Sequence, residues 1–194
     1  MAVQYWGNLL NAGAPWQTTA GTALSTATTA TISPQSAGSN DYTLQSNYFY
    51  PGLIIEIDAQ GFITTTGSST TLTVLLAANN AGSYTTLATS QGIATGTGTL
   101  TGLPWSLTAY IECTAAGSSG NTLSTEASML VASSVSAPTI GTTNNVTYIG
   151  MPSASGATAA AVNTTVPLGL PLRATLAGAN ATIQCTQYLI KAWS

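Results

Sequence analysis

Glu56 and Asp58 are the residues whose types and spacing best suggest chemistry. They stand two positions apart in the stretch NYFYPGLIIEIDAQGFITTT, in a chain of 194 residues that has only five acidic residues. If this stretch is a β-strand, the two carboxyl groups share one face, about 6.5–7 Å apart. Two carboxyl groups that flank a glycosidic bond can hydrolyse it. No second feature of the sequence supports hydrolysis, and we expect no enzymatic activity.

Other reaction centres lack the residues they need. The sequence contains no histidine, which excludes Ser-His-Asp and Cys-His arrangements and zinc sites that use histidine. Two cysteines cannot form a four-thiolate site, and the acidic residues are too dispersed for a calcium site. The glycines of GTGTLTG at 96–102 lack the cation and the helix of a phosphate-binding loop. We therefore expect no catalytic, cofactor-binding or metal-binding residues.

Charge is scarce along the whole chain. Charged residues make up 4% of the sequence, against about 25% in an ordinary globular domain. The two cations, Arg173 and Lys191, cannot neutralise a nucleic-acid backbone. A surface of Thr, Ser, Ala and Gly is wettable but weakly repulsive, which suits a protein covered by its neighbours. The composition favours a protein that works as a component of a larger assembly, and a slightly self-associating monomer is the alternative.

The hydrophobic content predicts a folded chain outside the membrane. Hydrophobic residues are 44% of the sequence and the net charge is −3, whereas disordered chains combine low hydrophobicity with high net charge. Thr, Ser, Gly or Asn interrupts every apolar run before it reaches about 18 residues, so we expect no membrane span. The start MAVQYWGNLLNAGAPW has no basic segment, so we expect no signal peptide.

Hydrophobic residues alternate with a period of two, which predicts strands. In 53–63 and in 105–113 the odd-numbered residues form one apolar face, and Glu56 and Asp58 lie on the opposite face. In 181–193 the pattern predicts one face with Ile183, Cys185, Gln187 and Leu189 and another with Thr182, Gln184, Thr186 and Tyr188. Turn clusters separate eight to ten such runs, and only 157–162 weakly resembles a helix. We predict an all-β, antiparallel β-sandwich of the jelly-roll type.

The two cysteines allow two interpretations. Cys113 and Cys185 both fall in strand-like runs, and sequence alone cannot decide whether they pair. A free cysteine behaves as a small hydrophobic residue. We expect two buried thiols.

The first residues differ from the rest of the chain. We predict an extended arm over 1–22 and a sandwich domain over 23–194. The arm carries Tyr5, Trp6 and Trp16, and burying each of these side chains would stabilise its docking by roughly 1.5–3 kcal/mol. We expect them to dock on a neighbouring chain or on another protein of the same assembly. Packing on their own domain is the alternative.

A carboxylate on a partly apolar strand face needs a partner. We expect Arg173 or Lys191 to lie near Glu56, Glu112 or Glu126, within the sandwich or across a subunit contact. Arg173 is the preferred candidate for Glu56, because the planar guanidinium matches a carboxylate. The alternative is that the acidic side chains simply face water.

Several motifs together suggest a family. The start QYWGNLL, the block NYFYPGLIIEIDAQGFITT, the run LPWSLTAYIEC and the terminal IQCTQYLIKAW follow one another along the chain. In this order they resemble small virion proteins of tailed bacteriophages, found especially in phages of actinobacteria. That family is similar to jelly-roll or tumour-necrosis-factor-like sandwiches that trimerise. The motifs that carry the resemblance relate to the fold, and they supply no active-site residues.

The resemblance implies a structural role. It implies a homotrimer that binds the major capsid protein on the outer capsid surface of the virion, made in the host bacterial cytoplasm, with no cofactor. A tail-associated or receptor- or glycan-binding module on the same fold is the alternative. A bacterial adhesin would need an export signal, which we do not find in the sequence.

Overall fold

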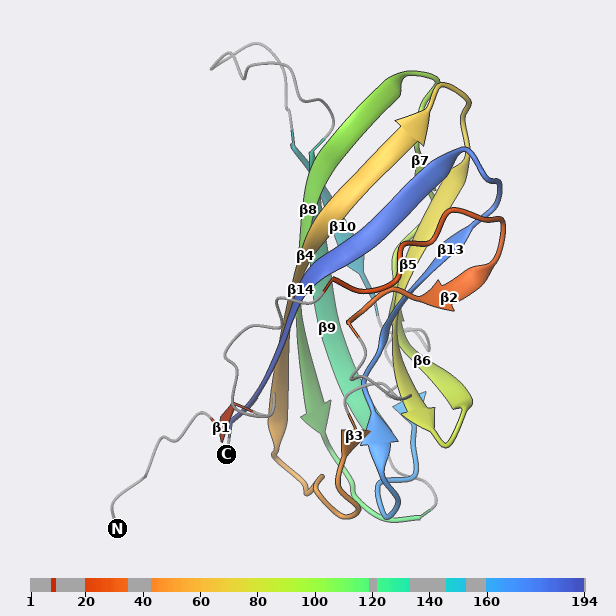
Figure 1. Ribbon diagram of the computed structural model, residues 1–194. Coiled ribbons are helices and arrows are strands. Elements are labelled where there is room, and N and C mark those ends of the chain that lie inside the picture. Colours follow the sequence, from red (N-terminus) through yellow and green to blue (C-terminus); the bar gives the residue numbers. More distant parts are fainter. Residues whose placement is uncertain are drawn as a thin grey trace.

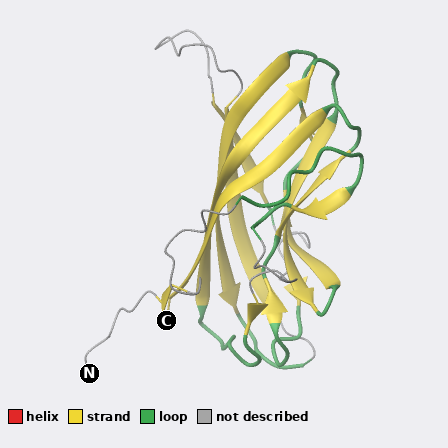
Figure 2. Cartoon of the chain, in the orientation of Figure 1, coloured by secondary structure: helices red, strands yellow, loops and turns green. Residues whose placement is uncertain are grey.

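A computed structural model describes residues 8–9, 20–34, 43–118, 122–132, 146–152 and 160–193. Strands and loops account for this part of the chain, and no helix occurs in it (Figure 2). The described residues accordingly contain no helix long and apolar enough to cross a membrane. The weak helix signal at 157–162 falls partly outside them, and 160–161 form a short strand.

The strands form two antiparallel sheets that face each other (Figure 1). Sheet A has the spatial order β1 (Asn8–Leu9), β14 (Ala181–Trp193), β4 (Ile54–Thr66), β8 (Thr99–Cys113), β9 (Thr122–Ala132), β10 (Val146–Met151), and β11 (Ala160–Ala161) also pairs with β9. Sheet B has the order β2 (Thr29–Thr31), β13 (Leu172–Leu176), β5 (Thr71–Asn80), β12 (Leu168–Gly169), β3 (Thr43–Leu44), and β6 (Ser83–Thr89) and β7 (Ile93–Ala94) also pair with β5. The predicted all-β antiparallel sandwich is confirmed. Eight of the fourteen described strands have five residues or more.

The core lies between the sheets and follows the predicted alternation. In β4, Ile55, Ile57 and Ala59 are buried, while Glu56 and Asp58 on the other face are half-buried. The same alternation buries the odd-numbered residues of β8 from 105 to 113. Because neighbouring strands keep this register, the inward faces of both sheets form one continuous hydrophobic core.

A turn and a close contact hold β4 in place. Gly52 adopts a positive φ of 88° in the Pro51–Gly52 turn that launches the strand, and its N–H donates to Cys113 O. Gly61 lies where a side chain has no room. A Cβ there would stand 1.9 Å from the carbonyl oxygen of Gln184 and 2.7 Å from the Trp105 ring. The glycine therefore lets β14 and Trp105 approach the backbone of β4.

The outer edge of β14 is covered by the start of the chain. Asn8 and Leu9 pair with Ala192 and Lys191. Further along, the N–H of Gly21 donates to Cys185 O at 2.8 Å, and Leu24 bridges Ile183. An open strand edge invites pairing with other chains, and these contacts occupy that edge at two points.

Candidate functional site

A polar cluster on the outer face of sheet A joins three strands. Lys191 Nζ lies 2.9 Å from Glu56 Oε1 and 2.8 Å from Asp58 Oδ2. Trp193 Nε1 donates to Glu56 Oε2 at 2.9 Å, and Thr108 Oγ1 donates to Asp58 Oδ1 at 3.1 Å. Each of the four carboxylate oxygens thus accepts one hydrogen bond, and the cluster links β4 to both of its neighbours.

A β-bulge in β14 brings Lys191 to this face. Cys185 pairs with Gly61, but Gln187 pairs with Gln60, so Thr186 is an extra residue with no register partner on β4, although its hydroxyl donates to Gln60 O at 3.3 Å. The Cys185 thiol donates to Gln187 O at 3.1 Å across the bulge. Lys191 is six residues after the buried Cys185, so in a regular strand it would also face the core. The bulge shifts the alternation by one residue and places Lys191 opposite Glu56.

The same bulge overturns part of the alternation predicted for 181–193. Tyr188 was expected on the outer face, but it is fully buried and its hydroxyl donates to Leu170 O. Gln187, expected inward, is half-buried on the outer face. The prediction holds up to Cys185 and is wrong beyond it, because a strict period of two cannot include an unpaired residue.

The surroundings of Lys191 keep it charged. Burial by itself lowers the pKa of Lys191, but the hydrogen bonds and negative charges of Asp58 and Glu56 outweigh it and hold that pKa above its ordinary value. The side chains of Glu56 and Asp58 are 14% and 22% exposed. Since one lysine ammonium bridges both carboxylates and their oxygens are occupied, this arrangement suits a structural clamp better than an acid–base pair.

The preferred partner for Glu56 was wrong. Arg173 lies on the outer face of β13, in sheet B, with its guanidinium carbon 3.9 Å from the centroid of the Tyr84 ring. Its Nε is buried and has no hydrogen-bond partner in the described part of the chain. The cation that lies near Glu56 is Lys191, the other of the two candidates. Glu112 and Glu126 are exposed, and no ion pair involving them occurs among the described residues.

Both cysteines are buried and free, as expected. Burial raises the pKa of Cys113 and raises that of Cys185 to about 12. Neither thiol is therefore poised as a nucleophile at neutral pH. Within the described ranges, no group of three His, Cys, Asp or Glu residues could hold a metal ion.

The outer face of sheet A also carries large apolar side chains that the sequence analysis did not single out. The sheet-A face, as we call it, exposes Ile54, Phe62, Tyr110, Leu130, Val146, Tyr148 and Trp193. Tyr148 is the most exposed of these, at 69%, and stands directly beside Leu130. A hollow of about 150 Å³ lies between Tyr110, Tyr148 and Glu126. Exposed apolar groups gathered on one face indicate an interaction surface.

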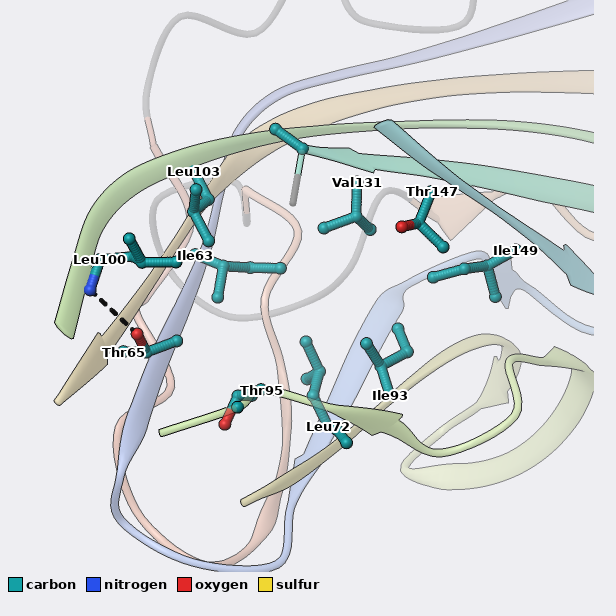
Figure 3. A pocket seen from close by; sticks show the side chains of 13 residues that line it. Ile63, Thr65, Leu72, Ile93, Thr95, Leu100, Leu103, Val131, Thr147 and Ile149 are labelled. Atoms are coloured by element: carbon teal, nitrogen blue, oxygen red, sulfur yellow. Dashed lines mark hydrogen bonds between the residues drawn. The ribbon is translucent and has the colours of Figure 1, made fainter. Parts of the chain in front are cut away.

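A cavity opens between the two sheets at the end of the sandwich where β4 ends (Figure 3). This seam cavity has a volume of about 460 Å³ and is lined by Ile63, Thr65, Leu72, Ile93, Ala94, Thr95, Gly96, Leu100, Leu103, Val131, Ala132, Thr147 and Ile149. No lining residue is charged. A second hollow of about 480 Å³ adjoins it and shares Ile93, Thr147 and Ile149. The lining residues come from six strands of both sheets and the loop after β7, so no sequence motif marks the site.

The remaining predicted interface residues, Tyr5, Trp6 and Trp16, lie outside the described residues. Comparison of the chain with protein-family models, with curated proteins and with solved structures gave no match. A function for this chain must therefore come from its own residues.

Proposed function

We propose that the chain is a structural virion protein that decorates the outer surface of a bacteriophage capsid. In this proposal it forms a homotrimer and binds the major capsid protein. The observation that carries it is the sheet-A face, where seven exposed apolar side chains share one sheet face with the cluster in which Lys191 pairs with Glu56 and Asp58. Such a face gains stability when another protein covers it.

Two further features support a structural role. The two sheets form a rigid scaffold with a continuous core, and many weak contacts repeated over a shell add up through multivalency. The resemblance of the sequence to small virion proteins points in the same direction.

Electron microscopy of the virion that carries this chain tests the location, and sedimentation of the purified protein at micromolar concentration tests the trimer. We expect trimeric density on the outer capsid surface, with the sheet-A face covered. The double variant Leu130→Ser and Tyr148→Ser should fold but bind capsids less tightly. Tyr50→Ser, which changes a comparably exposed tyrosine outside that face, is the matched control. Density confined to the tail, or a monomer, would contradict the proposal.

A receptor- or glycan-binding module is the second candidate, and the hollow beside Tyr110 and Tyr148 favours it. Glu126 and Ser128 also line this hollow, so aromatic surface and hydrogen-bonding groups meet there. Saturation-transfer NMR with neutral methyl glycosides separates the two candidates. Transfer that is lost in Tyr148→Ala but kept in Tyr50→Ala would favour the glycan-binding module.

A further inference from the structure

The seam cavity is an apolar site without an evident occupant from its own described residues. Its lining is formed mainly by aliphatic side chains, and the exposed Thr147 lies beside Ile149 (Figure 3). A volume of about 460 Å³ falls in the range of sites that enclose a bulky group, roughly 300–1,000 Å³. Because no lining residue is charged, the occupant should be uncharged and largely apolar.

The segment that best matches this chemistry is the start of the chain. Tyr5 and Trp6 are adjacent, and no charged residue occurs in the first 40 positions. Tryptophan and tyrosine are the residues that most often anchor protein contacts, since they combine a large apolar surface with one polar group. The hydroxyl of Thr147, which lines the cavity, offers an acceptor for the indole N–H.

Tyr5 and Trp6 cannot reach the cavity of their own chain. Asn8 is fixed beside Ala192, and Ala192 pairs with Ile55 near the start of β4. The cavity begins at Ile63, eight residues further along β4, which is about 26 Å away. Trp6 is two residues from Asn8, which gives its backbone a reach of about 7 Å. Figure 1 shows β1 and β7, which lines the cavity, toward opposite ends of the sandwich.

We propose that Tyr5 and Trp6 of one copy insert into the seam cavity of a neighbouring copy. This contact joins one end of a sandwich to the opposite end of the next, so it is heterologous, and a closed ring of such contacts gives a cyclic oligomer. The inference rests on the proposed homotrimer and supplies one of its contacts.

Crosslinking between copies tests the contact directly. One chain carries Gln4→Cys, next to Tyr5, and a co-expressed chain of different size carries Ala94→Cys, at an exposed position of the cavity lining. Mild oxidation should give a covalent pair of the two different chains. Ser83→Cys, exposed at the start of β6, replaces Ala94→Cys in the control and should give no such pair. The native Cys113 and Cys185 are buried and should stay unreacted.

Removing the Trp6 side chain and filling the seam cavity with a new side chain should weaken association equally. We expect Trp6→Ala and Ala94→Trp each to weaken assembly on the order of tenfold to a hundredfold, with no further loss when both are combined. Tyr50→Ala should leave assembly unchanged.

The outcomes separate this inference from the proposed function. A trimer that forms no Gln4–Ala94 crosslink and tolerates Trp6→Ala would overturn the inference and leave the trimer standing. Weakening by Trp16→Ala in place of Trp6→Ala would also overturn it, because Trp16 is close enough to Gly21 to pack on its own chain. A monomer at micromolar concentration would overturn both.

Discussion

The two cations of the chain lie on the outer faces of opposite sheets and have opposite surroundings. Lys191 in sheet A contacts two carboxylates at 2.8 and 2.9 Å. Arg173 in sheet B stacks on Tyr84, and its Nε has no hydrogen-bond partner within the described ranges. Side-chain chemistry alone would favour Arg173 as the partner of the carboxylates, because guanidinium matches carboxylate geometry better than ammonium does. Strand register, more than side-chain affinity, therefore decides which groups meet.

The largest expected effect comes from shifting the register after the bulge. Deleting Ile190 moves Lys191 into the fully buried position opposite Ile57. An unpaired ammonium in the core should cost more than about 4 kcal/mol or abolish folding. Deleting Thr186 removes the unpaired residue and keeps Lys191 opposite Glu56, so it should cost far less. Urea unfolding of both variants measures the difference, and equal losses would contradict the role given to the bulge.

Gly61 tests how tightly β4 is packed opposite the bulge. Gly61→Ala places a methyl group against a backbone carbonyl and the Trp105 ring, and overpacking of this kind should cost about 2–3 kcal/mol. Gly150→Ala is the matched control, because no atom lies within 4 Å of its added Cβ. Thermal unfolding compares the two. A cost for Gly61→Ala within about 0.5 kcal/mol, as at an unconstrained site, would contradict the close approach.

Removing the Lys191 ammonium leaves Glu56 and Asp58 side by side without a cation. We expect Lys191→Met to cost about 2 kcal/mol, less than at a fully buried pair because all three side chains are partly exposed. The triple variant Glu56→Gln, Asp58→Asn and Lys191→Met removes the charges together and should recover most of this loss. Denaturant unfolding at pH 7 is the measurement, and a triple variant less stable than Lys191→Met would contradict the view that the two unpaired carboxylates cause this loss.

Burial of the Cys185 thiol, beside the β-bulge, should make the stability of the fold depend on pH. The pKa of Cys185 is about 12 in the folded chain against an ordinary value of 9.0, so above pH 9 the unfolded chain loses the proton first. Stability is therefore full below pH 9 and should fall by about 1.4 kcal/mol per pH unit between pH 9 and 12. Comparing wild type with Cys185→Ala at pH 8 and 10 isolates this term. An identical pH dependence in both proteins would exclude it. The pKa of Lys191 is also held above its ordinary value of 10.5 by Asp58 and Glu56, so its charged form is favoured at both pH 8 and pH 10.

Arg173 should show the smallest effect. Arg173→Met removes a cation–π contact at a partly exposed position, which should cost about 0.5–1 kcal/mol. A loss above about 3 kcal/mol, measured in the same unfolding assay as Lys191→Met, would indicate a buried charge pair in solution. Arg173 would then be the partner of a carboxylate, as the sequence analysis preferred.

Much of the fold follows from local sequence. The alternation in β4 and β8 predicts which residues are buried, and the Pro51–Gly52 turn and the close approach at Gly61 also follow from sequence signals. The second half of β14 was predicted on the wrong face, because no composition signal marks Thr186 as a bulge. The sheet-A face could have been anticipated in part, since Tyr110 and Trp193 alternate with buried residues. The seam cavity could not, because its lining comes from six strands spread along the sequence.

The sequence by itself determined a sparsely charged, all-β sandwich with two buried thiols and a carboxylate pair on one strand face. These features depend on the local alternation of side chains, which a period of two encodes directly. Only the tertiary structure decided that Lys191 pairs with Glu56 and Asp58, and that Arg173 lies on Tyr84. Such partners are set by pairing between strands that lie far apart in the sequence. There a single unpaired residue, Thr186, changes the face of every residue that follows it in β14.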